Sequence, residues 1–141
     1  MKADPKIEAA VMNVINRYVE SYIKRDADAV LALWVPDPDV VLIGTGVDER
    51  RIGLVDIKAQ CERDFAQGTS IKISWHSVSA AGSVAWVAAD LTARVKTSGR
   101  EISLQGRLTS VLERRGDRWF IVQRHLSLPA AGQREGQSFQ T

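Results

Sequence analysis

The chain has 141 residues, 45% of them apolar and 26% charged, a composition that predicts one globular domain and excludes a disordered chain. Nineteen Lys and Arg against 17 Asp and Glu leave a formal net charge of +2. The basic residues are scattered and form no stripe that could follow a phosphate backbone, so we expect no nucleic-acid partner.

Cysteine content and apolar runs favour a cytoplasmic protein. The single cysteine, Cys61, excludes an internal disulfide and fits a reducing compartment. The longest apolar run, Val84 to Ala89, is far shorter than a membrane span. The first residues match neither a signal peptide nor a membrane anchor, so we expect no membrane partner.

The first half of the chain predicts three helices. Apolar residues recur at helical spacing from Pro5 to about Lys24. Asp26 can cap a short second helix, which a pair of prolines ends. A third helix is expected between Gly53 and Gly68. Strand-like runs lie at about residues 40–43, 70–79, 83–95, 101–113 and 118–128.

Several motifs accompany this order of elements. They are Tyr18-Val19-Glu20, the run from Arg25 to Trp34, Asp39-Val40-Val41, Gly44-Thr45-Gly46, Arg107-Leu108-Thr109, Trp119 and His125-Leu126-Ser127. With them, residues 8–130 resemble the SnoaL-like branch of the nuclear transport factor 2-like superfamily.

The resemblance implies an α+β fold of conical shape, with three N-terminal helices against a curved, mostly antiparallel sheet that encloses a pocket. It implies one domain over residues 1–130 and a C-terminal tail over 131–141. Such folds host isomerases, cyclases, dehydratases and association modules. Tyr18 falls where ketosteroid isomerases carry an oxyanion-hole tyrosine. Gly44 falls where they carry the base and Thr109 lies near their protonated aspartate, so we do not expect that chemistry.

Two hairpin loops set the expected register of the last three strands. A two-residue loop at Ser98-Gly99 pairs Asp90 with Arg107. A three-residue loop at residues 115–117 then pairs Arg107 with His125, giving one row of polar side chains. A four-residue loop would instead turn His125 to the other face.

The two faces of this sheet differ in chemistry. One is mixed and carries Trp86, Asp90, Arg107, Thr109, Trp119, Gln123 and His125; the other is aliphatic. Guided by the resemblance, we predict the mixed face under the helices and a homodimer through the aliphatic face. The reverse arrangement, with helices on the aliphatic face and polar groups in water, is the alternative.

The predicted ligand site is a pocket with a polar floor and aromatic walls. Its residues are Arg107, His125, Trp34, Tyr18, Tyr22, Trp86, Thr109 and Gln123, with Asp90 orienting Arg107. The structural alternatives are an Arg107–Asp90 ion pair, a hydrogen-bonded core histidine at 125, and aromatic residues that only fill the core.

The predicted function is binding of a small molecule. One alternative is an acid–base enzyme of the cyclase, isomerase or dehydratase kind that uses His125 with Asp90 or Tyr18. A further alternative is an association module. Two histidines and no HExxH or CxxC motif predict no metal, and no motif predicts a cofactor.

Overall fold

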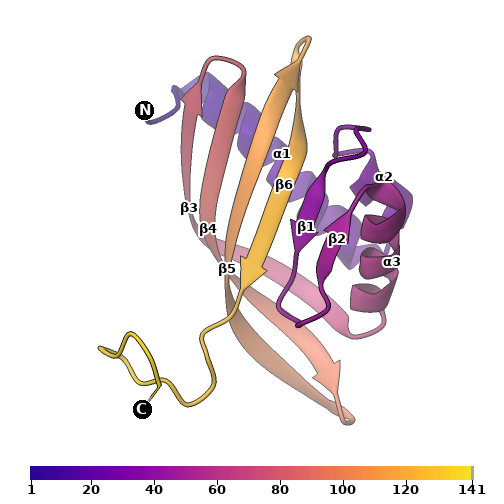
Figure 1. The fold of residues 1–141 in the computed structure, drawn as a ribbon, viewed down its shortest axis with the longest axis vertical. Helices are drawn as coiled ribbons and strands as arrows, with labels where there is room; N and C mark the ends of the chain where they lie inside the picture. The colour runs from indigo at the N-terminus through magenta and orange to yellow at the C-terminus, as the bar shows by residue number, and fades with distance from the viewer. Residues whose placement is uncertain (141) are drawn as a thin grey trace.

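The computed structural model describes residues 1–140, with every side chain among them except that of Thr69. Three helices precede and interrupt a sheet whose last four strands are long (Figure 1). The elements are α1 (Pro5–Ile23), α2 (Ala27–Leu31), β1 (Val41–Ile43), β2 (Arg50–Ile52), α3 (Leu54–Phe65), β3 (Gly68–Ala81), β4 (Val84–Thr97), β5 (Arg100–Arg115) and β6 (Arg118–Ser127).

Local sequence signals explain where the helices begin. The Asp4 carboxylate accepts a hydrogen bond of 2.9 Å from the backbone N–H of Ile7, and Pro5 occupies the first helical position. The Asp26 carboxylate caps α2 in the same way, through the N–H of Ala29. The predicted helices are therefore confirmed, within a few residues at their ends.

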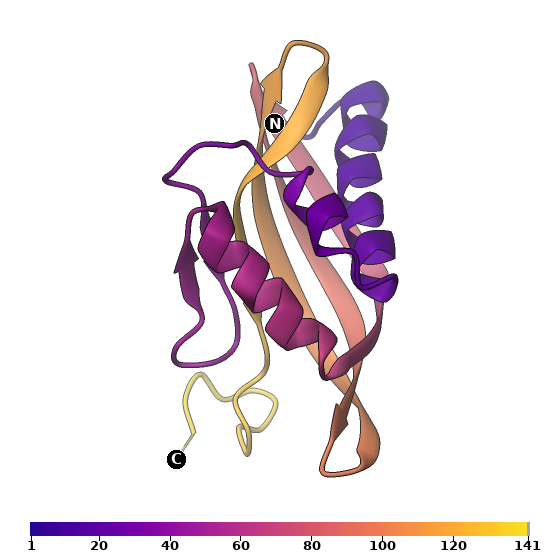
Figure 2. The same ribbon diagram turned by 90° about the vertical axis from the view of Figure 1, so that its right-hand side faces the viewer.

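The sheet has six strands in the order β2-β1-β6-β5-β4-β3, and only the β1–β6 pairing is parallel. The predicted α+β class and mostly antiparallel sheet are confirmed. The short strand β2 is not among the strands predicted from the sequence. All three helices lie on one side of the sheet (Figure 2), which leaves the other side open. After Ser127 the described chain forms turns and coil.

The first predicted hairpin register is confirmed. Asp90 pairs with Arg107 across β4 and β5, and the turn uses Ser98 and Gly99, both at positive φ. The second register is wrong. Gly116-Asp117 forms a two-residue turn, and Arg107 pairs with Ser127 rather than with His125.

A bulge in β6 shifts this second register. Val111 pairs with Gln123 but the next residue, Leu112, pairs with Ile121, so Val122 has no opposite partner. Before the bulge, Ile121 faces the helices. After it, Arg124 does, because one inserted residue inverts the alternation of side chains.

The predicted assignment of the two sheet faces is wrong. The aliphatic residues of β4 and β5, among them Val87, Leu91 and Leu108, are buried beneath the helices. Burying such side chains removes them from water and stabilises the fold. A dimer through the aliphatic face is therefore excluded, because the helices already cover that face. We call the other, exposed side of the sheet the open face.

Candidate functional site

A cavity of about 330 Å³ lies between the helices and the curved sheet. Its walls come from α1, α3, the β1–β2 segment and the far halves of β4 and β5, which extend past the helices (Figure 1). The volume falls within the range usual for small-molecule sites. Most of its apolar lining consists of Leu42, Ile71, Leu91, Ala93, Leu104 and Leu126.

One buried cation lines this cavity. Arg124 is only 7% exposed, and its guanidinium carbon lies 4.3 Å from the centroid of the Tyr18 ring. Such cation–π contacts are favourable, more so when water is excluded. No described residue accepts a hydrogen bond from the Arg124 side chain, so its N–H groups are available to an occupant of the cavity.

Three side chains form a hydrogen-bonded cluster around Gln60, which lines the same cavity as Arg124. The Gln60 amide nitrogen donates to Asp64 Oδ1 at 2.8 Å and to Glu49 Oε1 at 3.1 Å. The Gln60 carbonyl oxygen accepts from Arg51 Nε at 3.0 Å. Because Arg51 fixes the oxygen side of the amide, the nitrogen side must face the two carboxylates.

The Glu49 side chain folds back on its own segment, the one that connects β1 and β2. Its Oε2 accepts from the Gly46 N–H at 2.9 Å, and its Oε1 lies 3.9 Å from Arg63. A Cβ on Gly44 would lie 2.1 Å from Glu49 Oε2, so only glycine at position 44 leaves room for this carboxylate. The space that a side chain at position 44 would take is thus occupied by the Glu49 carboxylate.

Burial changes the protonation behaviour of the cavity's acids. Burial raises the pKa of Asp64, although the Gln60 hydrogen bond and the Arg124 charge oppose this. Burial also raises the pKa of Tyr22 to about 12 and that of Tyr18 further, so both phenols stay neutral at physiological pH. Burial therefore favours the protonated form of the Asp64 carboxyl.

The wall beside Tyr22 is tightly packed. The Tyr22 ring contacts Phe65 edge-on, with centroids 5.3 Å apart. A Cβ on Gly68 would lie 1.8 Å from the Tyr22 hydroxyl, so glycine is needed where β3 passes α1. Arg25 donates at 3.2 Å to the carbonyls of both Phe65 and Gly68, which ties the end of α3 to the start of β3.

The structure divides the predicted site residues between two places. Tyr22 lines the cavity, and Tyr18 lines a separate small cavity of about 10 Å³ that shares the lining residue Arg124 with it. Trp34 is buried in the core, where its Nε1 has no acceptor among the described residues. The other predicted residues lie on the open face: Trp86, Asp90, Arg107, Thr109, Gln123 and His125.

The predicted polar floor of Arg107 and His125 is therefore wrong in its placement. Both side chains are exposed, and the predicted contact of Arg107 with Asp90 is absent, since these two described side chains form no ion pair. The sheet separates His125 from Tyr18, so these two residues cannot share an acid–base site. The physical reason is that the helices cover the more apolar face.

The polar residues that do line the cavity were missed from the sequence. Gln60 and Asp64 are four residues apart beside the apolar stripe of α3, a spacing that places them on one helix face. In β6 residues 119–122 are all apolar, so the sequence there shows no alternation from which the bulge, or the position of Arg124 under the helices, could be predicted.

The His, Cys, Asp and Glu side chains of the described residues are the groups that could hold a metal ion. No cluster of three or more His, Cys, Asp or Glu side chains that could hold an ion occurs among residues 1–140. Cys61 is buried, and burial raises the pKa of its thiol to about 11, which makes it a poor nucleophile.

The sequence of residues 11–131 matches the profile of the SnoaL-like domain. This chain belongs to the SnoaL-like domain family. The match runs from within α1 to beyond the end of β6, so it includes Tyr18, Asp64 and Arg124. A comparison with curated proteins found no match to this SnoaL-like chain.

Solved structures agree with this SnoaL-like assignment at the level of the fold. An NTF2-like protein of unknown function from Pseudomonas putida has 19% identity and a TM-score of 0.75, covering 98% of this chain and 99% of its own. A candidate dehydratase of the NTF2-like family from Streptomyces avermitilis has 18% identity, a TM-score of 0.75, and coverage of 87% and 97%. A candidate calcium/calmodulin dependent protein kinase II association domain from Xanthomonas campestris has 22% identity, a TM-score of 0.75, and coverage of 92% and 90%.

These structural matches show that the SnoaL-like chain has the NTF2-like fold. Because the identities are low, its ligand and activity must be inferred from its own residues. Among the described residues, no helix combines the length and apolarity that a membrane crossing needs.

Proposed function

We propose that this SnoaL-like domain binds a small molecule with an apolar body in the cavity between α1, α3 and the sheet. The observation that carries the proposal is Arg124, a buried cation with no hydrogen-bond acceptor among the described residues, at the wall of a cavity of about 330 Å³. A buried charge is costly unless it is paired. A ligand acceptor group would supply the missing partner.

The remainder of the cavity supports the same proposal. Its apolar walls are suited to an aliphatic or aromatic body, and its few polar groups gather at one end, around Gln60 and Asp64. Small-molecule sites commonly combine apolar walls with a few convergent polar groups. In this proposal Arg124 is the cationic group of the ligand site, in place of Arg107 and His125, which were expected from the sequence.

A neutral fluorescent probe, N-phenyl-1-naphthylamine, tests whether the cavity takes an apolar body. We expect saturable fluorescence enhancement with the wild-type protein. Ala93→Trp fills the cavity from β4 and should remove this binding. Ala88→Trp is the matched control, because Ala88 lies on the open face of the same strand. Equal probe binding by the two variants would contradict the proposal.

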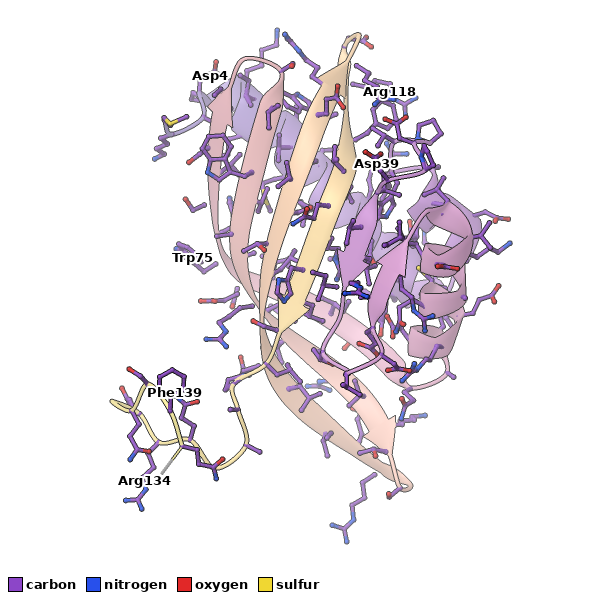
Figure 3. All side chains as sticks on the ribbon, viewed as in Figure 1. Asp4, Asp39, Trp75, Arg118, Arg134 and Phe139 are labelled. Carbon is purple, nitrogen blue, oxygen red and sulfur yellow. The ribbon has the colours of Figure 1, made fainter. Side chains whose placement is uncertain are left out.

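We also propose that the open face joins two copies of the chain into a homodimer. Trp75 on β3 is 53% exposed and projects from the sheet edge (Figure 3), and Trp86 on β4 is 36% exposed. Large aromatic side chains are enriched at the centres of protein interfaces. Asp90 pairs with Trp75 on β3 and with Arg107 on β5. The described Asp90 and Arg107 side chains form no ion pair with one another and could pair across a two-fold axis.

A further inference from the structure

We propose that the cavity selects a carboxylic acid with an apolar body, held as an anion on Arg124 while a protonated Asp64 donates a hydrogen bond to the same carboxylate. This inference rests on the proposed function, because it names the chemical class of the ligand for that cavity. The apolar body would lie along β4 and β5, against Leu91, Ala93 and Leu104.

The geometry of Arg124 favours a planar anion. One face of the guanidinium is covered by Tyr18, and the N–H groups of the planar guanidinium point outwards in its own plane. A guanidinium matches a carboxylate through two parallel hydrogen bonds, which are stronger than bonds between neutral groups. Since no described residue supplies an acceptor, the ligand is the natural source of one.

Asp64 has one oxygen committed and one available. Its Oδ1 accepts from Gln60 at 2.8 Å, whereas no described residue bonds to its Oδ2. The Gln60 amide cannot turn its carbonyl oxygen towards Asp64, because that oxygen accepts a hydrogen bond from Arg51. Burial already raises the pKa of Asp64, and an incoming anion would raise it further. A protonated Asp64 then becomes a donor through Oδ2.

The charged and titratable groups around Asp64 come from every neighbouring element. Arg124 approaches from β6, Glu49 from the β1–β2 segment, and Arg63 and Cys61 from α3 itself. Tyr18 and Tyr22 approach from α1 and remain neutral. The Glu49 charge is offset locally by the Gly46 N–H and by Arg63, so the positive charge of Arg124 is left to face the cavity.

The sign of the expected pH dependence follows from this arrangement. The bound complex needs a proton on Asp64, so affinity falls as the pH rises through the pKa that Asp64 has in the folded protein. Asp64→Asn is neutral at every pH and can still donate through its amide, so this variant should bind the acid without that fall.

The experiment uses the full chain and two competitors of the naphthylamine probe: 4-phenylbutanoate and its neutral amide, 4-phenylbutanamide. Wild-type protein should bind the acid at least about tenfold more tightly than the amide, the effect of one charge-assisted hydrogen bond. An amide that competes as well as the acid would overturn the ligand class. This comparison needs no variant and therefore does not depend on whether a variant folds.

The two proposals fail in different ways. Loss of probe binding itself, or probe binding that Ala93→Trp leaves intact, contradicts the cavity as a binding site. Probe binding with no preference for the acid leaves the cavity in place and contradicts only the acid class. A pH profile for Asp64→Asn identical to that of the wild type contradicts the role of Asp64.

Discussion

The guanidinium carbon of Arg124 lies 4.3 Å from the centroid of the Tyr18 ring, and this contact joins the last strand of the sheet to its longest helix. It covers one face of a cation whose N–H groups have no acceptor among the described residues. The relationship depends on the bulge at Val122, which turns Arg124 towards the helices. A local irregularity in β6 thus creates the polar end of the cavity.

Arg124→Met should abolish the preference for 4-phenylbutanoate over its amide while leaving the neutral probe bound. Methionine keeps much of the apolar stem but removes the charge, and the lost cation–π contact should cost about 2 kcal/mol of stability. Competition titrations measure the first effect and urea unfolding the second. Arg107→Met, on the open face, is the control and should leave the preference unchanged; an unchanged preference in Arg124→Met would count against the account.

Gly68→Ala should destabilise the fold by about 1–3 kcal/mol, as overpacking of a well-packed site usually does. The added Cβ would lie 1.8 Å from the Tyr22 hydroxyl, so Tyr22 must move. In a Tyr22→Leu background the same substitution should cost clearly less, because the opposing atoms are gone. A double-mutant cycle by chemical denaturation measures this coupling, and additive effects would contradict it.

Asp64→Asn should gain stability relative to the wild type as the pH rises. Burial raises the pKa of Asp64 in the folded state, so the stabilising contribution of its proton is present at low pH and lost as the pH rises through that folded pKa. Asparagine has no proton to lose. Denaturant unfolding from about pH 4 to about pH 8 should therefore give two curves that diverge. Glu62→Gln, on the exposed side of α3, is the control and should stay nearly parallel to the wild type.

Trp86→Glu should convert a dimer into a monomer, since it places a charge in the proposed contact on the open face. Light scattering should give about twice the 15.6 kDa chain mass for the wild type and a single chain mass for the variant. Ala59→Glu, at an exposed position of α3, should remain a dimer. A wild-type protein that scatters as a single chain at micromolar concentration would exclude this interface.

Much of the fold could be predicted from the sequence, because its signals are local. Asp4 and Pro5 begin α1 as expected, and Ser98-Gly99 sets the pairing of Asp90 with Arg107 correctly. The candidate site was largely missed because its position depends on two non-local facts. One is which face of the sheet the helices cover, and the other is the bulge at Val122.

The prediction of which sheet face the helices cover was wrong. Arg107 and His125 looked like a buried polar row because the resemblance favoured polar groups under the helices. The free energy of burial favours the aliphatic residues there instead, since each large apolar side chain contributes about 1.5–3 kcal/mol when buried. Of the predicted aromatic walls, Tyr22 lines the cavity, whereas Trp34 is part of the core.

The most direct test of the central claim is a crystal structure of the protein grown with 4-phenylbutanoate. The account predicts density for the phenyl ring among Leu91, Ala93 and Leu104, with the carboxylate within hydrogen-bond distance of both Arg124 and Asp64. A cavity that stays free of the ligand, or a carboxylate bound instead to Arg107 on the open face, would contradict it.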